Sequence, residues 1–226
     1  MTKVRHGFFG ASGEKSGSGI RNVIETWKRG LMPSVCPRLI ISCNGTGGVS
    51  KIASEFGINF YHFKKPYDDP LPWQSLFDAV DYLWLIGCSI RAVGLEEFIG
   101  RIANEHPADL TIEDPEKPGH PLFGGKGMTD IHVHRKVLER GLLSVASTTH
   151  FVRCQTGTDR DYDSGNLIIN VNRGDCGCDG VETADGLQDK VKALQKQTTP
   201  LDIEAVASGR IRCERNVSGL WHVVRD

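Results

Sequence analysis

The sequence lacks a strong net charge, a long apolar run and any internal repeat. Its 27 Lys and Arg residues nearly balance 28 Asp and Glu residues, which gives a formal net charge of −1. A nearly neutral chain has no general electrostatic attraction to DNA or RNA. No apolar run reaches the ~20 residues of a membrane-spanning helix, and the N-terminus does not form a convincing signal peptide. We therefore expect no nucleic-acid partner, no membrane insertion and a cytoplasmic location.

The cysteines do not form the pattern of a disulfide framework. The seven cysteines are odd in number and dispersed, and three of them lie in or beside apolar strand-like runs. This pattern favours buried, reduced thiols. Cys176 and Cys178 are separated by one residue, which does not match the common zinc spacings. Four remote histidines could add ligands: His120, His132, His134 and His150. We favour a surface turn at the cysteine pair and pocket or helix-start positions for His132 and His134, and we expect no metal.

The length and composition suit one globular domain. The 226 residues are 39% hydrophobic, which is enough for a sizeable core. We predict a single domain over residues 1–226, with a long active-site loop or lid at about 107–130, where Pro, Gly and Asp are frequent. A helical region is expected from about residue 183 onward. We expect it to break at Pro200, because proline removes a helix hydrogen bond.

Apolar strand-like runs alternate with helical patterns along the chain. This βαβ rhythm predicts an α/β fold with a mostly parallel sheet and helices on its faces. The expected strands are Val4–Ala11, Arg38–Cys43, Asn59–Phe63, Asp81–Cys88, Ser144–Arg153 and Asn166–Val171, and the expected helices are Ile20–Arg29, Gly47–Phe56, Trp73–Ala79 and Ile131–Arg140. Sheets of this kind bind ligands beyond the carboxyl ends of their strands, so we expect the functional site there.

A glycine-rich loop between the first strand and the first helix is a candidate anion site. Backbone N–H groups of Gly17, Ser18 and Gly19 open the helix, where they can hold a phosphate. The alternative is a flexible turn. The loop is not a Walker motif, because Glu14 stands where that motif needs the glycine before its lysine. Lys64, near a neighbouring strand end, could supply a further positive charge or belong to a solvated loop.

The segment Asn104-Glu105-His106-Pro107 carries the strongest chemical signal in the chain, together with Asp163 further on. An amide such as that of Asn104 can donate a hydrogen bond to a developing oxyanion, and His106 can act as general acid or base near neutral pH. Asp163 can orient that imidazole or relay protons through water. The alternative is that Asn104 and His106 only cap the end of a strand.

Six segments in order along the chain strengthen the catalytic interpretation. They are Ser16-Gly17-Ser18-Gly19, Arg91-Ala92-Val93, Gly100-Arg101-Ile102-Ala103-Asn104-Glu105-His106-Pro107, His132-Val133-His134-Arg135, Thr148-Thr149-His150-Phe151-Val152 and Asp163-Ser164-Gly165. Their order resembles that of the formyltransferases that use 10-formyltetrahydrofolate, most nearly the phosphoribosylglycinamide formyltransferases. The resemblance runs, with gaps, from about Val4 to Gly209.

The resemblance implies a Rossmann-like formyltransferase fold and assigns roles to residues. Asn104, His106 and Asp163 would be the catalytic triad. The donor, 10-formyltetrahydrofolate, would be the co-substrate, and its pterin would bind two segments. These are the backbone of Arg91, Ala92 and Val93, and the loop before Asp163, which includes Asp161.

The sequence also departs from the family pattern, mainly around the acceptor. Ser18 stands where the family usually has asparagine, and Gln195 falls near a glutamate that helps to hold the ribonucleotide. We therefore expect retained chemistry with an altered acceptor pocket. The acceptor would be a small, phosphorylated amine such as glycinamide ribonucleotide or a relative. A nucleotide-sugar N-formyltransferase, a hydrolase releasing formate and a non-catalytic binding protein are the alternatives, and a homodimer is a further expectation.

Overall fold

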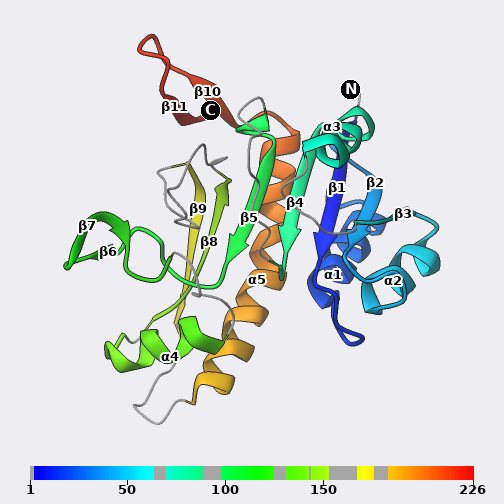
Figure 1. Ribbon diagram of the computed structural model, residues 1–226. Helices are drawn as coiled ribbons and strands as arrows, with labels where there is room; N and C mark the ends of the chain where they lie inside the picture. Colours follow the sequence, from blue (N-terminus) through cyan, green and yellow to red (C-terminus); the bar gives the residue numbers. More distant parts are fainter. Residues whose placement is uncertain are drawn as a thin grey trace.

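A seven-stranded sheet forms the centre of the protein, in the order β3-β2-β1-β4-β5-β8-β9 (Figure 1). The computed structural model describes residues 3–63, 70–88, 98–124, 131–142, 144–152, 167–175 and 183–226. The sheet strands are β1 (Val4–Gly10), β2 (Val35–Ser42), β3 (Asn59–His62), β4 (Tyr82–Ile86), β5 (Ile102–His106), β8 (Ser144–Phe151) and β9 (Ile168–Asp175). The helices are α1 (Ser18–Lys28), α2 (Gly48–Phe56), α3 (Pro70–Ala79), α4 (Ile131–Glu139) and α5 (Ala184–Ala207).

The sheet has a parallel part and an antiparallel part. Strands β3, β2, β1, β4 and β5 run parallel, whereas β8 runs antiparallel to β5 and β9 antiparallel to β8. The predicted α/β fold with a mostly parallel sheet is therefore confirmed. The antiparallel direction of the last two strands is an addition, because the side-chain period of a strand does not depend on the direction of its neighbour.

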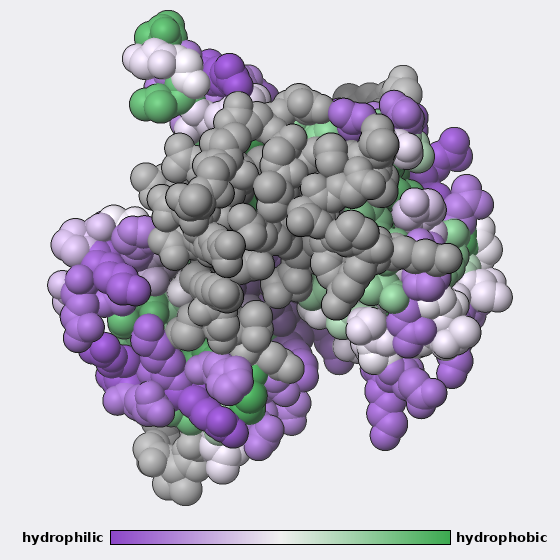
Figure 2. Space-filling model, viewed as in Figure 1, coloured by the Kyte–Doolittle hydropathy of each residue, from purple (hydrophilic) through white to green (hydrophobic). Residues whose placement is uncertain are grey.

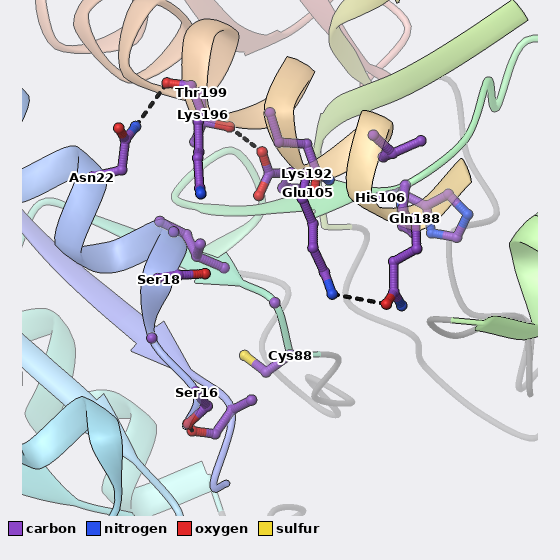
Figure 3. Close-up of a pocket in the computed structure, with 18 of the residues that line it drawn as sticks. Ser16, Ser18, Asn22, Cys88, Glu105, His106, Gln188, Lys192, Lys196 and Thr199 are labelled. Carbon is purple, nitrogen blue, oxygen red and sulfur yellow. Dashed lines mark hydrogen bonds between the residues drawn. The ribbon is translucent and has the colours of Figure 1, made fainter. Parts of the chain in front are cut away.

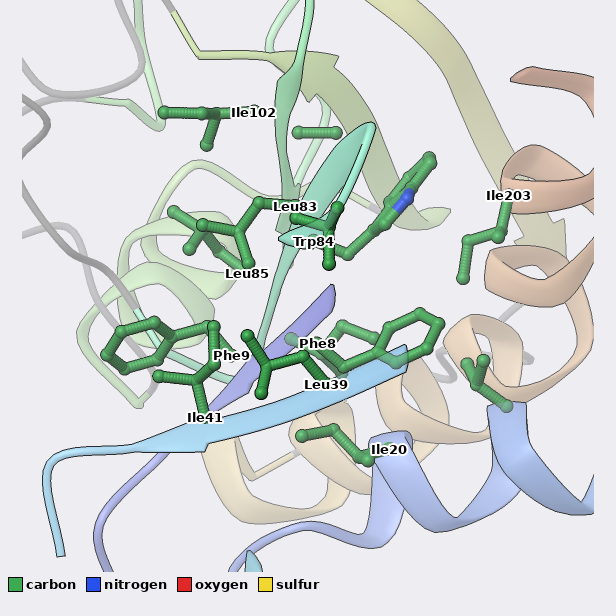
Figure 4. Close-up of a cluster of buried hydrophobic side chains, with 14 of the residues drawn as sticks. Phe8, Phe9, Ile20, Leu39, Ile41, Leu83, Trp84, Leu85, Ile102 and Ile203 are labelled. Atoms are coloured by element: carbon green, nitrogen blue, oxygen red, sulfur yellow. The ribbon is translucent and has the colours of Figure 1, made fainter. Parts of the chain in front are cut away.

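Neighbouring residues of β1 supply two layers of the core. Phe8 and Phe9 are fully buried, and successive strand side chains point to opposite faces of the sheet. The ring of Phe9 lies 6.5 Å, centroid to centroid, from Trp73 of α3. Figure 4 shows Phe8 in one buried cluster with Ile20 of α1 and Ile203 of α5. Apolar packing on both faces thus holds the parallel strands in place.

Most predicted elements occur within a few residues of their expected bounds. Helix α1 begins at Ser18, two residues before the expected start, because Gly17 makes the turn with a left-handed φ of 102°. Strand β2 begins at Val35, since Val35 pairs in register with Val4. In α4 the buried residues are Val133, His134 and Val137. The apolar residues of that helix at 131 and 138 are only half-buried.

The expected break at Pro200 does not occur. Helix α5 continues through this proline to Ala207. A proline has no N–H for the carbonyl four residues before it, which here is that of Lys196. The side-chain amide of Asn22, in α1, donates to this carbonyl at 2.7 Å instead. A contact from another helix thus replaces the hydrogen bond that the proline removes.

Two small hairpins lie outside the central sheet. Strands β6 (Glu113–Asp114) and β7 (Lys117–Pro121) form one of them, within the segment expected to be a long loop. Strands β10 (Ile211–Arg215) and β11 (Trp221–Arg225) form the other, after α5. Strands β6 and β7 carry no apolar alternation. In β10 and β11 apolar residues alternate and pack partly against the core (Ile211, Cys213, Trp221 and Val223), but both strands are short and the sequence analysis did not predict them.

Candidate active site

A cavity of about 540 Å³ opens at the carboxyl ends of β1, β4 and β5. The loop after β1 and one side of α5 close it, as Figure 3 shows. In Figure 2 hydrophilic side chains flank a recess at the lower centre of the molecule. Five predicted site residues line the cavity: Gly17, Ser18, Gly19, Asn104 and His106. The structure therefore brings the glycine-rich loop and the Asn-x-His-Pro segment together, although they are far apart in sequence.

The glycine-rich loop is held tightly against the core. A Cβ on Gly17 would lie 2.6 Å from Cδ1 of Ile52, and the φ of Gly17 is left-handed. The Ser16 hydroxyl donates to the carbonyl of Ala11 at 2.6 Å, which closes the loop. The first N–H groups of a helix have no partner within the helix. Those of α1 begin at Ser18, on the cavity wall, so this wall suits an anion.

Asn104 and His106 lie at the end of β5 and are almost fully buried, with exposed fractions of 6% and 3%. The Asn104 amide nitrogen lies 3.3 Å from Nε2 of His150, on the paired strand β8. Nε2 of His106 lies 2.7 Å from the carbonyl oxygen of Phe123. Because a carbonyl can only accept, Nε2 carries a proton. Nδ1 is then an acceptor in the neutral ring and a second donor in the charged ring.

The two histidines at the start of α4 have different environments. His134 is buried and lines the cavity, whereas His132 is exposed. The expected pocket position is therefore found for His134, and His132 is a surface residue near the start of the helix. No group of three or more His, Cys, Asp or Glu side chains within the described ranges is arranged to hold a metal ion.

One face of α5 forms the wall opposite the glycine-rich loop. Its cavity-lining residues recur at helical spacing: Gln188, Val191, Lys192, Gln195, Lys196 and Thr199. The Lys192 ammonium donates to Oε1 of Gln188 at 2.8 Å, and the Gln195 amide donates to the Ser147 hydroxyl at 3.2 Å. Of this row, sequence reasoning named only Gln195. The polar residues at this spacing in an expected helix were the available signal.

Glu105 also lines the cavity, and the sequence analysis did not predict it. It was treated only as the variable position of the Asn-x-His-Pro segment, yet it lines the cavity beside Asn104 and His106. The hydroxyl of Thr199 donates to its carboxylate. Burial raises the pKa of Glu105 to about 7, against the effect of the Thr199 hydrogen bond, and nearby Asp202 adds to the rise. A carboxyl group in the site thus titrates near neutral pH.

The described cysteines show no sign of a nucleophile. Cys36, Cys43, Cys88 and Cys213 are free and half-buried. Cys88 lines the cavity, and its thiol donates to the carbonyl of Phe9 at 3.1 Å. Burial raises the pKa of the Cys88 thiol far above its usual value. Since a thiolate is the reactive form, Cys88 is an inert cavity residue.

Several predicted site residues lie outside the described ranges. They are Lys64, Arg91, Ala92, Val93, Asp161 and Asp163. Cys176 and Cys178 are outside these ranges too. The assignments made for all of these residues stay predictions.

Comparison with known proteins adds an independent test of the resemblance. No family model matches the chain. It is 29% identical over 162 residues to the chloroplastic phosphoribosylglycinamide formyltransferase of Arabidopsis thaliana, a match that covers 67% of this chain and 50% of that protein. The chain thus spans about half the length of the curated plant relatives that it matches.

Solved structures decide the fold. Glycinamide ribonucleotide transformylase 1 from Symbiobacterium toebii superposes with a TM-score of 0.75 at 23% identity, covering 99% of this chain and 94% of the other. The chain has the formyltransferase fold. A formyltetrahydrofolate deformylase from Pseudomonas syringae pv. tomato also superposes, with a TM-score of 0.71 at 15% identity, over 99% of this chain and 66% of that one. The resemblance inferred from the six segments is therefore confirmed, and the likeness to the deformylase shows that two kinds of chemistry share this fold.

Proposed function

We propose that the protein transfers a formyl group from 10-formyltetrahydrofolate to an amine acceptor that carries an anionic group. One observation carries this proposal: Asn104 and His106 share a single cavity with the loop Gly17 to Gly19. An oxyanion donor, a proton-transfer group and an anion site are thus within reach of one small substrate. Sequence likeness to a phosphoribosylglycinamide formyltransferase supports glycinamide ribonucleotide or a close relative as the acceptor.

The transfer needs charge stabilisation at the formyl oxygen. The acceptor nitrogen would attack the formyl carbon, forming a C–N bond and placing negative charge on that oxygen. The Asn104 amide and a protonated His106 would donate hydrogen bonds to it. The bond from carbon to the folate nitrogen then breaks, and a proton passes from the attacking amine to that nitrogen. Asp163 is proposed to relay this proton through water.

Donor binding is proposed for two segments outside the described ranges. The backbone of Arg91, Ala92 and Val93, and the loop containing Asp161, would receive the pterin. The motif order supports this placement, because the same two segments flank the Asn-x-His-Pro segment in the family that the chain resembles.

The charged groups on the cavity wall fit an acceptor that carries an anionic group. Lys15, Lys192 and Lys196 line the cavity together with the N-terminus of α1, so an anionic acceptor is attracted. Lys64, outside the described ranges, is proposed as a further contact. Gln195 falls near the position where the family has a glutamate that helps to hold the ribonucleotide. Because this residue differs here, a nucleotide sugar is the second candidate acceptor.

The function is tested with 10-formyl-5,8-dideazafolate as donor and a panel of amines, including glycinamide ribonucleotide and amino nucleotide sugars. Loss of the formyl group from the donor and formation of formylated amine are measured in the same tube. We expect acceptor-dependent turnover. Formate release without any acceptor would show hydrolysis instead, and no donor consumption at all would contradict an enzymatic role.

The anion site has its own test. A Lys15→Met variant should weaken binding of glycinamide ribonucleotide by roughly tenfold, the usual effect of losing about 1.4 kcal/mol. Lys117→Met, on the exposed strand β7, is the matched control. Substituting Gly17 would be a poorer test, because a side chain there strains the left-handed backbone and meets Ile52 even without a ligand. Equal affinity in both lysine variants would remove Lys15 from the acceptor site.

Cellular location and assembly also stay proposals. No helix of the described residues has the length and apolar character needed to cross a membrane. The Arabidopsis relative is chloroplastic by name. We propose a cytoplasmic enzyme, acting on small molecules without nucleic acid, and a homodimer. Fractionation of the source cells and light scattering of the purified protein test these two points.

A further inference from the structure

Glu105 lines the cavity between the loop Gly17 to Gly19 and His106. Along β5 it stands between Asn104 and His106, but its side chain is on the other face of the strand, toward α5, where Thr199 donates to it. Figure 3 shows its carboxylate between the side chains of Lys196 and His106, on the side of the cavity that faces Ser18. An acceptor reaching from the anion loop to His106 would therefore pass this carboxylate.

The charges of the cavity make Glu105 distinctive. Lys15, Lys192 and Lys196 line the cavity, and Glu105 is the only carboxylate among its described lining residues. Primary amines of the α-amino kind have a pKa of about 8, so most of the acceptor is an ammonium ion at neutral pH. The three lysines favour the acceptor's anionic group but repel its ammonium group. The Glu105 carboxylate, in the same cavity, compensates this repulsion.

We propose that Glu105 is the catalytic base that receives the acceptor's ammonium group and removes one of its protons before attack. The inference rests on the proposed function. The N–H bond of the ammonium breaks and an O–H bond forms on the carboxylate, which leaves a neutral amine with a free electron pair for the formyl carbon. The proton then passes from Glu105 to water at the cavity mouth. The second amine proton goes to the folate nitrogen during transfer.

The surroundings of Glu105 fit this role. From α5 it faces Thr199, Asp202 and two lysines, 192 and 196, and the same cavity holds Lys15 and two histidines, 106 and 134. Its pKa of about 7 is set by burial and matches the value that a base needs near neutral pH. Thr149 pairs with Glu105 across β5 and β8 and donates to Asp202 at 2.7 Å.

The main test compares the pH dependence of kcat/KM for the acceptor in the wild type and in Glu105→Gln. Glutamine has the same shape, and the Thr199 hydroxyl can still donate to its amide oxygen. The wild-type profile should rise through about pH 7. The variant should rise only near pH 8, as the acceptor loses its own proton, and should be about eightfold slower at pH 6.5, where about a quarter of Glu105 is ionised in the wild type but only about 3% of such an amine is neutral. Above pH 9 the two should converge.

A second variant moves the same titration without removing the carboxylate. The Thr199 hydrogen bond lowers the pKa of Glu105, so Thr199→Val should raise it and shift the acid limb of the profile to higher pH. Thr198→Val is the matched control, because the Thr198 hydroxyl donates to the carbonyl of Leu194 within α5 and Thr198 does not line the cavity. Its acid limb should stay in place.

The outcomes separate this inference from the proposed function. If the wild type transfers no formyl group to any amine, both fail. If the wild type is active and the Glu105→Gln profile has the wild-type shape, only the inference fails. A purely structural role for Glu105 would lower the folded fraction, measured by circular dichroism, and leave the acid limb in the remaining activity unmoved. That result would also overturn the inference.

Discussion

The sheet has an apolar part, strands β1 and β2, and a polar part, strands β5 and β8, and the two parts bury different kinds of side chain. Strands β1 and β2 bury mainly large apolar side chains, among them Phe8, Phe9, Ile40 and Ile41. Strands β5 and β8 bury six polar ones among their apolar residues: Asn104, His106, Ser147, Thr148, Thr149 and His150. The comparison indicates that the apolar part supplies most of the folding free energy, whereas the polar part uses its interior for the site.

Hydrogen bonds make the polar interior possible. A buried polar group without a partner costs about 1–3 kcal/mol. Thr148 donates to the carbonyl of Ala108 at 2.7 Å, and Ser147 donates to that of His106 at 3.1 Å. These bonds also fix the chain at His106 and two residues after it. The same network therefore offsets the cost of burial and positions the proposed catalytic residue.

The largest stability effect should come from the apolar part. Phe9→Ala removes a fully buried ring that packs on Phe63 and Trp73, and should lower the free energy of unfolding by about 3–5 kcal/mol. Leu201→Ala, at an exposed position of α5, is the control and should change it by less than about 0.5 kcal/mol. Urea unfolding measures both. A loss below about 1 kcal/mol for Phe9→Ala would contradict the comparison.

Acid should destabilise the apolar part of the sheet through His6, on β1. This side chain is fully buried and accepts from the indole N–H of Trp84 at 2.9 Å. Burial lowers the pKa of His6 to about 4, although Asp81 opposes the shift. The unfolded chain binds a proton at a higher pH than the folded one, so stability is present above pH 6.5 and falls toward pH 4. We expect a loss of up to about 3 kcal/mol.

Unfolding of the wild type and of His6→Leu is measured at several pH values between 4 and 7. The variant is less stable at neutral pH, because the Trp84 N–H loses its acceptor. The informative quantity is the slope, which should be flatter in the variant over this range. Parallel slopes in the two proteins would assign the acid sensitivity to other groups.

Glu105 should have the opposite pH dependence. Its pKa is raised to about 7 in the folded protein, so its contribution to stability is present below the unfolded pKa of about 4.5 and is lost as pH rises through 7. At pH 8 Glu105→Gln should therefore be more stable than the wild type, by up to about 3 kcal/mol. Glu139→Gln, at an exposed position of α4, is the control. Urea unfolding at pH 5 and pH 8 measures the difference in unfolding free energy between the wild type and Glu105→Gln. An equal difference at both pH values would exclude this pKa shift.

The two parts also differ in how far the sequence predicted them. The apolar runs around Phe8 and Ile40 are long and lie between helical patterns, so local periodicity located β1, β2 and their helices. The motif order placed Asn104 and His106 at a strand end, where the structure has them. Both successes depend on residues that are close in sequence or on an ordered set of short segments.

The features that the sequence analysis predicted wrongly or missed depend on contacts between residues that are distant in sequence. The helix passes through Pro200 because Asn22, far away in sequence, donates to the carbonyl of Lys196. Glu105 is a site residue because α5 lies over β5 and encloses its carboxylate. No local pattern contains either contact. Strand direction in β8 and β9 is likewise a matter of topology and not of side-chain period.

The most direct test of the account measures formyl transfer and unfolding in the same two variants, His106→Ala and Phe9→Ala. Turnover is corrected for the folded fraction. The account predicts that His106→Ala lowers transfer by about 10²–10⁴-fold, the range for loss of a general acid or base, and leaves a folded protein. Phe9→Ala should do the reverse, with lowered stability and near wild-type turnover per folded molecule. Near wild-type transfer by folded His106→Ala would contradict the central claim that the polar part of the sheet performs the chemistry.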